Sequence, residues 1–187
     1  MLFRSGQLSY FFKYRINEIL SAGPNGGYRA QIIYAGGDDM FIVGNWSDII
    51  YAAKDIREAL DEFTGNGALT ISAGIGMFDA KYPISRMASE TGELEDKAKL
   101  FVRRTGAGAT KDAVALWMTE NVFGWEEFIG NVLPKVREIE AMLTENEKGN
   151  SFIYRVLELL RSTDSASSIP RLAYALARSF EDRKSVV

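Results

Sequence analysis

The fold is decided by one stretch of sequence, Ile32-Ile33-Tyr34-Ala35-Gly36-Gly37-Asp38-Asp39-Met40-Phe41-Ile42-Val43-Gly44. Two apolar runs flank a pair of glycines, and glycine adopts the positive φ that a tight turn needs, so the pattern predicts a β-hairpin. The tip carries two adjacent carboxylates, Asp38 and Asp39, which repel each other unless a cation lies between them and a phosphate. Gly-Gly-Asp-Asp is also an ordinary turn composition. The apolar arms favour the metal-binding alternative.

The composition restricts the chemistry that the chain can perform. The sequence has 187 residues, of which 47% are hydrophobic and 25% charged, and it contains neither histidine nor cysteine. This excludes Cys/His zinc sites, disulfides and nucleophile systems that depend on histidine. Catalysis would have to use carboxylates, lysine or arginine, backbone dipoles and a hard cation. We therefore expect Mg²⁺ or Mn²⁺ as the cofactor.

Charge and hydropathy limit the partners. A net charge of −3 argues against a whole surface bound to nucleic acid, and the short patch of Arg103, Arg104 and Lys111 is open as a local contact or as solvated surface. No apolar stretch approaches the roughly 20 residues of a membrane span, and no basic-then-apolar leader is present. We expect no membrane contact and a cytoplasmic location.

Hydrophobic periodicity predicts the elements of the first part of the chain. The N-cap of the second helix is expected at Ser47. The predicted elements are helices at about 8–20, 47–63 and 87–101, and strands at 28–34, 40–43, 69–77 and 113–117.

The strand at 69–77 has one nearly bare face, formed by Thr70, Ser72, Gly74 and Gly76. A bare face lets another part of the structure approach the backbone closely. Either a helix packs there, which is the commoner reason, or a nucleotide does.

This order of elements predicts an α+β fold with helices on one face of a mainly antiparallel sheet. It is the palm arrangement, a ferredoxin-like fold, of nucleotidyl cyclases and polymerases. A palm has a further strand before the first helix, beside the hairpin, and residues 1–7 are too few to form it. We expect residues 1–119 to be a partial palm domain that lacks its first strand.

Beyond Trp117 the sequence predicts helices alone. Apolar residues are helically spaced from Trp125 onward, and Pro134 should kink or restart the helix. Further helices are expected from Phe152 and from Pro170. We expect residues 120–187 to form an all-α C-terminal domain.

At this point the motifs match a known family. Tyr34 to Asp39, preceded by Leu-Ser-Tyr-Phe-Phe at 8–12, resembles the large subunit of type III CRISPR effector complexes, particularly the III-A kind. The later motifs Ser-Ala-Gly-Ile at 72–75, Pro-Ile-Ser-Arg-Met-Ala at 83–88 and Glu-Leu-Glu-Asp-Lys-Ala-Lys at 93–99 extend the resemblance to nearly the whole chain. The Lys-Asp-Ala-Val strand at 111–114 and the terminal helices agree with it. Diguanylate cyclases usually carry Gly-Gly-Asp/Glu-Glu-Phe at the hairpin instead.

The resemblance implies a second palm domain that joins ATP into cyclic oligoadenylates when the complex holds a matching target RNA. Asp38 and Asp39 would be the catalytic, metal-binding carboxylates of a two-metal site. Gly36 and Gly37 would allow the turn and leave room for phosphate, and Lys97 would contact phosphate or be a solvated surface lysine. The expected partners are other subunits of the complex, including a small helical subunit that docks on the C-terminal helices, with guide RNA and target RNA.

The departures from the family leave alternatives open. The family's large subunit also has an N-terminal nuclease domain and a first palm domain, so the chain resembles a C-terminal fragment that is inactive alone. The first alternative is a non-catalytic scaffold module that docks subunits and RNA. The second is a diguanylate-cyclase-like signalling enzyme, which Asp39 in place of glutamate disfavours.

Overall fold

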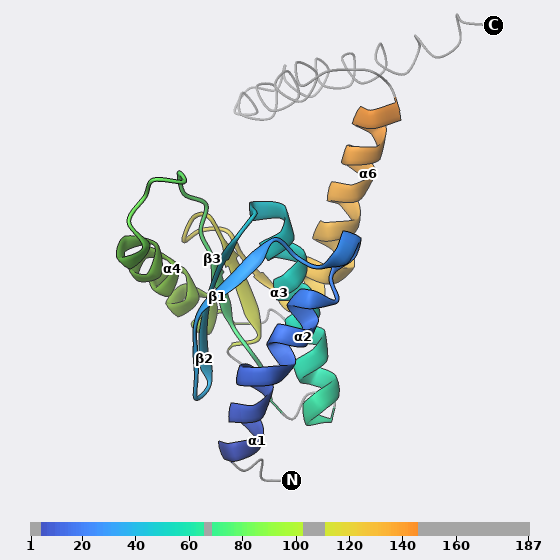
Figure 1. Cartoon of the computed structure of the whole chain (residues 1–187). Helices are drawn as coiled ribbons and strands as arrows, with labels where there is room; N and C mark the ends of the chain where they lie inside the picture. The colour runs from blue at the N-terminus through green and yellow to red at the C-terminus, as the bar shows by residue number, and fades with distance from the viewer. Residues whose placement is uncertain (1–4, 66–68, 103–110, 146–187) are drawn as a thin grey trace, which may run out of the picture. The chain divides into compact units, whose positions relative to one another are not determined.

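The computed structural model describes residues 5–65, 69–102 and 111–145 (Figure 1). The chain divides into two compact units, Met1–Val132 and Leu133–Val187. The first unit contains α1 (Ser5–Tyr10), η1 (Phe11–Arg15), α2 (Ile16–Ser21), η2 (Pro24–Gly26), β1 (Ala30–Gly36), β2 (Asp39–Gly44), α3 (Trp46–Thr64), β3 (Ala73–Ile75), α4 (Ile84–Lys99), β4 (Ala113–Leu116), β5 (Val122–Gly124), α5 (Trp125–Glu127) and η3 (Phe128–Val132).

The first predicted helix is confirmed as α1, the π-helical segment η1 and α2, which follow one another without a break from Ser5 to Ser21. Its apolar stripe packs against α3 in the first core of this unit. The buried residues of that core are Phe11, Phe12, Ile16, Leu20, Ala52, Ile56 and Leu60. The inward side chains of the hairpin, Ala30, Ile32, Met40 and Ile42, cover the same core. The helices therefore hold one face of the hairpin.

The predicted hairpin is confirmed as an antiparallel pair, β1 and β2. Gly36 pairs with Asp39, so Gly37 and Asp38 are the two residues of the connecting turn. The register shifts between Ile32 and Tyr34, which places one extra residue in β1. The two acids thus lie where the sequence predicted, at the tip.

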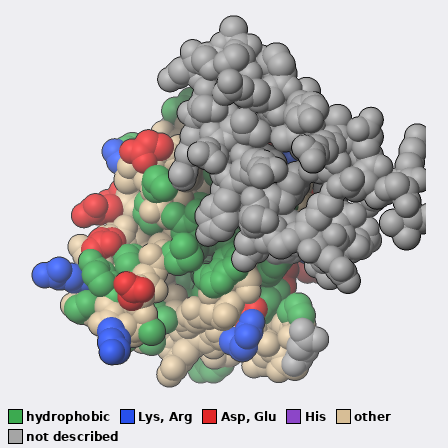
Figure 2. Space-filling model, turned by 90° about the horizontal axis from the view of Figure 1, so that it is seen from above, with side chains coloured by type: hydrophobic (Ala, Val, Ile, Leu, Met, Phe, Trp, Pro, Cys, Tyr) green, Lys and Arg blue, Asp and Glu red, His purple; other side chains and the backbone are tan. Residues whose placement is uncertain are grey.

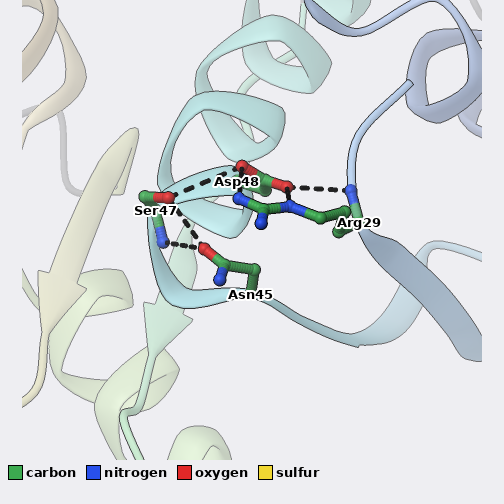
Figure 3. Close-up of polar contacts among 4 residues, drawn as sticks. All are labelled: Arg29, Asn45, Ser47 and Asp48. Atoms are coloured by element: carbon green, nitrogen blue, oxygen red, sulfur yellow. Dashed lines mark hydrogen bonds and ion pairs between the residues drawn. The ribbon is translucent and has the colours of Figure 1, made fainter. Parts of the chain in front are cut away.

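The N-terminus of α3 closes the opposite end of the hairpin. The predicted N-cap, Ser47, is wrong: Asn45 is the cap, and its Oδ1 accepts hydrogen bonds from Ser47 N at 3.1 Å and Ser47 Oγ at 2.7 Å (Figure 3). The helix begins at Trp46, one residue before the predicted N-cap. Asn45 has extended backbone dihedral angles, and its side chain accepts a hydrogen bond from the Ser47 N–H, which has no partner within the helix.

Asp48 ties this helix end to the start of β1. Its Oδ2 accepts hydrogen bonds from Arg29 N at 2.9 Å and Arg29 Nε at 2.8 Å (Figure 3). The hydrogen bond from the Arg29 side chain holds the pKa of Asp48 below its ordinary value. Asn45 N also donates to Arg29 O at 2.8 Å. The base of the hairpin is therefore fixed to α3 by backbone and side-chain contacts.

The remaining strands form a second sheet in the order β3-β4-β5. β3 pairs with β4 in parallel, and β4 pairs with β5 antiparallel. The expectation of helices alone beyond Trp117 is wrong here, because residues 122–124 pair with β4. β2 and β3 each have a single neighbour and belong to different sheets. This division is consistent with a palm that lacks its first strand.

The bare strand face is covered by a helix. A Cβ on Gly74 would lie 2.2 Å from Thr91 O and 2.5 Å from Glu95 N, so α4 can approach β3 only where this side chain is absent. Ala113 and Ala115 of β4 pack against α4 in the same way. Of the two alternatives for this face, the structure has the packed helix.

α3 lies on the opposite face of the second sheet, so that the strands run between α4 and α3 (Figure 1). Arg57 of α3 pairs with the buried carboxylate of Asp112, with Nε–Oδ1 at 2.9 Å and Nη2–Oδ2 at 3.2 Å. The hydrogen bond and the charge of Asp112 raise the pKa of Arg57 against the opposing effect of burial. This pair attaches the start of β4 to α3.

The second unit is described only in α6 (Leu133–Glu145), where Pro134 is the second residue, as expected for a restarted helix. The expected helices from Phe152 and Pro170, and the patch residues Arg103 and Arg104, lie outside the described residues. The domain boundary at residue 119 stays a prediction. Among the described helices, none is long and apolar enough to cross a membrane.

Candidate functional site

The candidate site lies at the tip of the β1–β2 hairpin. Asp38, in the turn, and Asp39, the first residue of β2, are both exposed. In the described part of the chain, no hydrogen bond or ion pair holds either carboxylate. Both side chains are therefore available to an external cation or a phosphate-bearing ligand.

The two glycines of the motif differ in what the backbone requires of them. Gly37 has a φ of 66° and open space around its Cα, so the turn itself demands glycine. A Cβ on Gly36 would lie 2.7 Å from the hydroxyl of Tyr34. The space beside Gly36 where phosphate was expected is thus bordered by the side chain of Tyr34, a residue that is 57% exposed.

The alternation of β2 fixes the direction of Asp39. Met40 and Ile42 pack on the helical core. Successive side chains of a strand point to opposite faces. Asp39 therefore shares its face with Phe41 and Val43, away from α1, α2 and α3.

Lys99, at the last position of α4, lies within electrostatic reach of Asp39. The hydrogen bond to Glu95 raises the pKa of Lys99, and the charges of Glu95, Asp96 and Asp39 add to this effect. Lys99 is 60 positions away from Asp39 in the sequence, so this charge interaction joins two distant segments of the chain.

The predicted phosphate contact, Lys97, is exposed on the same helix. A hydrogen bond from Thr119 lowers the pKa of Glu120, and the charge of Lys97 contributes to that shift. The role of Lys97 at the site stays a prediction. Lys99, on the same helix, was not singled out by sequence reasoning. The signal for Lys99 was the Lys-Ala-Lys spacing, which offers two lysines two positions apart on one helix.

Metal ligation is limited to the acid pair within the described residues. There, no group of three or more Asp, Glu, His or Cys side chains could hold a metal ion. Two exposed carboxylates still fit a hard cation such as Mg²⁺, which keeps several waters and binds through one or two carboxylates plus phosphate oxygens. The donor chemistry therefore fits Mg²⁺ or Mn²⁺ with weak affinity.

Fold and tip together define the class of protein. An α+β unit whose hairpin turns on glycine and carries two adjacent acids at its tip is a palm-type domain of the nucleotidyl cyclase and polymerase kind.

Comparison with known proteins narrows the class to a family. The family model "Cas10/Cmr2, second palm domain" matches residues 3–115, and the model "CRISPR RNA silencing complex Cmr2 subunit, second helical domain" matches residues 127–186. The chain therefore belongs to the Cas10/Cmr2 family, and it comprises sequence of the second palm domain and of the second helical domain. The expected family and the α+β palm fold are both confirmed.

The chain spans about a fifth of the length of the curated relatives that it matches. It is 47% identical to a Cas10/Csm1 protein of subtype III-A from Enterococcus italicus, described as a single-strand-specific deoxyribonuclease, over 94% of this chain and 22% of that protein. A crystal structure of a Csm1–Csm4 cassette in complex with one ATP is similar over 66% of this chain and 19% of that chain, at 30% identity and a TM-score of 0.56. Another such cassette, in complex with pppApApA, matches 91% of this chain and 27% of that chain at 25% identity and a TM-score of 0.61.

Proposed function

We propose that this chain is the nucleotide-joining palm region of a type III-A CRISPR effector large subunit, and that the complete protein makes cyclic oligoadenylate from ATP when target RNA is bound. The observation that carries the proposal is the exposed acid pair at the hairpin tip, whose carboxylates have no hydrogen bond or ion pair within the part of the chain that the structure describes. The relatives with bound ATP and pppApApA support adenine nucleotides as substrates.

The reaction is a nucleotidyl transfer. The 3′-hydroxyl oxygen of one ATP attacks the α-phosphorus of another, the bond to pyrophosphate breaks, and the hydroxyl proton leaves to water. When bound, Mg²⁺ or Mn²⁺ neutralises phosphate charge and lowers the pKa of the attacking hydroxyl. Asp38 and Asp39 would hold the cation, which explains how a chain without histidine could support the step.

The other residues of the tip would bind and orient the triphosphate. Gly37 keeps the turn tight, so that both carboxylates project from one short segment. Lys99 would neutralise phosphate charge from the side of α4, since an ammonium is a compact point charge suited to phosphate. Gly36 leaves Tyr34 room to move aside when a ligand approaches.

The decisive experiment uses the longer parent protein in its complex. Asp38→Asn with Asp39→Asn should abolish cyclic oligoadenylate formation from ATP and Mg²⁺ with matching target RNA, as measured by chromatography of the products. Asp79→Asn, at an exposed acid of the β3–α4 connection, is the matched control and should retain synthesis. Undiminished synthesis in the double variant would overturn the proposal.

The 187-residue chain alone should make no measurable product. Within the described residues the acid pair has no third ligand, and β2 and β3 lack a strand that would join their sheets. Robust synthesis by the isolated chain would show that these two features do not limit catalysis. Synthesis of cyclic diguanylate from GTP would instead favour the diguanylate-cyclase-like alternative, which the matching family models do not support.

A scaffold function is the second candidate. The related structures are cassettes of Csm1 with Csm4, so this chain's parent would also assemble with other subunits. Figure 2 shows hydrophobic side chains open to solvent between acidic and basic ones on the face seen from above, a mixture suited to subunit contacts. Contacts with guide RNA, target RNA and a small helical subunit, and the cytoplasmic location, stay predictions.

The scaffold candidate has its own measurement. If Asp38 and Asp39 have no catalytic role, the wild-type complex should make no cyclic oligoadenylate. The double asparagine variant should then assemble as the wild type does. The C-terminal helices, where a small helical subunit is expected to dock, lie outside the described residues, and their sequence includes Arg171 and Arg178. Reversing both to Glu should weaken capture of a small helical subunit in a pull-down. Reduced RNA retention with unchanged capture would contradict subunit docking there.

A further inference from the structure

Tyr34 lies on the outward face of the hairpin because β1 contains an extra residue. Ile32 packs on the helical core, and strict alternation along a strand would place Tyr34 on the same inward face. The register shifts between these two residues, so that Tyr34 pairs with Phe41, which shares its face with Asp39. Tyr34 is accordingly 57% exposed. The extra residue therefore turns this tyrosine away from the core and toward the face that carries an acid of the tip.

The side chain of Tyr34 extends along β1 toward the tip. A Cβ on Gly36, two residues further on, would lie 2.7 Å from the Tyr34 hydroxyl and 3.1 Å from Cζ of its ring. Gly36 pairs with Asp39, and residues directly opposite each other in an antiparallel pair have Cβ atoms about 4.5–5.5 Å apart. The hydroxyl of Tyr34 therefore occupies the place opposite Asp39 that a side chain at position 36 would fill.

This hydroxyl has a free hydrogen to donate. Within residues 5–65, 69–102 and 111–145, no hydrogen bond holds Oη of Tyr34, and neither Asp38 nor Asp39 accepts one. A cation bound by the two acids would bring phosphate oxygens to the same end of the hairpin. A phosphate oxygen is a charged acceptor, and hydrogen bonds to charged acceptors are about twice as strong as neutral ones. A neutral donor on the face of Asp39 therefore suits a phosphate oxygen that the cation holds.

We propose that Tyr34 is a substrate-binding residue of the tip, whose hydroxyl donates a hydrogen bond to a phosphate oxygen of the nucleotide. The inference rests on the proposed function, which supplies the nucleotide and places its cation at Asp38 and Asp39. Because Gly36 has no side chain, the tyrosine ring can turn about its own bonds and follow the ligand. The acids then fix the position of the triphosphate through the cation, and Tyr34 fixes its orientation along the hairpin.

The main test is the ATP dependence of cyclic oligoadenylate synthesis by the parent protein in its complex with target RNA. Tyr34→Phe removes the hydroxyl alone. It should raise the half-saturating ATP concentration about three- to tenfold, the loss expected for one hydrogen bond, with little change in kcat. Tyr14→Phe is the matched control, because it removes the same atom from a tyrosine of η1 that is 60% exposed. The control should leave both constants unchanged.

Inorganic tripolyphosphate separates a contact to phosphate from a contact to ribose or base. It carries the phosphates alone, so as an inhibitor that competes with ATP it should lose affinity in Tyr34→Phe by a similar factor. A weaker affinity for ATP with an unchanged inhibition constant for tripolyphosphate would overturn the assignment to phosphate.

The affinity of the 187-residue chain for Mn²⁺ alone, measured by calorimetry, tests for a merely structural role. Tyr34→Phe should bind Mn²⁺ as the wild type does, because the hydroxyl is not a ligand of the cation in this proposal. A loss of Mn²⁺ affinity would show that the substitution disturbs the tip itself, and it would overturn the inference.

The inference and the proposed function can fail separately. If Tyr34→Phe has the ATP dependence of the wild type while Asp38→Asn with Asp39→Asn abolishes synthesis, the inference is wrong and the proposed function stands. Equal losses in Tyr34→Phe and Tyr14→Phe would also overturn the inference, because they would show a general effect of removing a surface hydroxyl. Synthesis that persists in the double asparagine variant would overturn the proposed function, and this inference with it.

Discussion

The two ends of the β1–β2 hairpin are built for different purposes. At the base, Arg29, Asn45 and Asp48 join both strands to the first turn of α3 by hydrogen bonds of 2.8 to 3.1 Å. At the tip, Asp38 and Asp39 are exposed and have no hydrogen bond or ion pair among the described residues. The hydrogen bonds that hold the hairpin therefore lie at its base, the end that a ligand does not need to reach.

The contrast shows how a small domain can present two neighbouring acids without a large cost to folding. Like charges at an exposed tip are screened by water, whereas the same pair at the base would lie against α3. The clamped base and the inward face of the strands hold the hairpin in place. The tip is then free to bind a cation and phosphate.

The largest expected effect is at the base. In Gly44→Ala the new Cβ would lie 2.4 Å from Arg29 O and 2.7 Å from Ala30 Cα, so the strands must shift apart. We expect a loss of about 1–3 kcal/mol in the free energy of unfolding, as for other overpacked sites, measured by urea denaturation. Gly37→Ala, at the tip, is the comparison: it strains a φ of 66° but meets no atom, and should cost about 1 kcal/mol. Equal losses would contradict the distinction between the two ends.

The next effect concerns the cap of α3. Asn45→Ala removes the acceptor of the hydrogen bonds from Ser47 N and Ser47 Oγ, and should destabilise the chain by about 1 kcal/mol. Asn45→Asp preserves an acceptor beside the positive helix end and should retain most of the stability. Thermal unfolding followed by circular dichroism measures both variants. If Ser47→Ala lowers the stability of the chain more than Asn45→Ala does, Ser47 is the cap after all.

A smaller, pH-dependent effect is expected at Asp48. The hydrogen bond from Arg29 lowers the folded-state pKa of Asp48 below the ordinary value of 3.8. Its contribution to stability is therefore present above the unfolded pKa and is lost as the pH falls through the folded pKa. In thermal melts, Asp48→Asn should differ from the wild type at neutral pH, begin to converge with it as the pH falls below about 4, and match it only below the folded-state pKa of Asp48. A difference that persists at lower pH would show that the contact is not linked to ionisation.

The smallest effect on stability is expected at the tip. Asp38→Asn with Asp39→Asn should change the free energy of unfolding by less than about 0.5 kcal/mol, because both side chains are exposed and lack partners. The same variant should lose its weak affinity for Mn²⁺ in calorimetry, since two carboxylates supply the protein ligands. Unchanged Mn²⁺ affinity would remove the acid pair from the metal site, and a large destabilisation would show that the tip is structural.

Sequence reasoning succeeded where the signal was local. The hairpin, α3 and α4 could be predicted because turn glycines and apolar spacing act over a few residues. The cap was misplaced from Asn45 to Ser47, since both residue types suit an N-cap and only the backbone decides between them. β5 was missed because a three-residue strand has almost no pattern of its own and exists by pairing with β4.

The candidate site shows the same limit. Asp38, Asp39 and Gly37 were identified from adjacent residues, and the structure places them together in one turn. The role of Lys97 cannot be read from adjacent residues, because the side chains that α4 presents depend on its rotation against β3, which the contact at Gly74 fixes. The ion pair of Arg57 with Asp112 spans 55 positions and had no sequence signal at all.

The sequence by itself determined the acid-tipped hairpin, the helices that cover it and the absence of histidine and cysteine chemistry. These follow from short-range backbone preferences and from composition, which need no knowledge of distant contacts. Only the tertiary structure decided what covers the bare face of β3 and which end of the hairpin is clamped. Those features depend on packing and charge interactions between segments far apart in the chain, where a rotation of one helix exchanges one side chain for another.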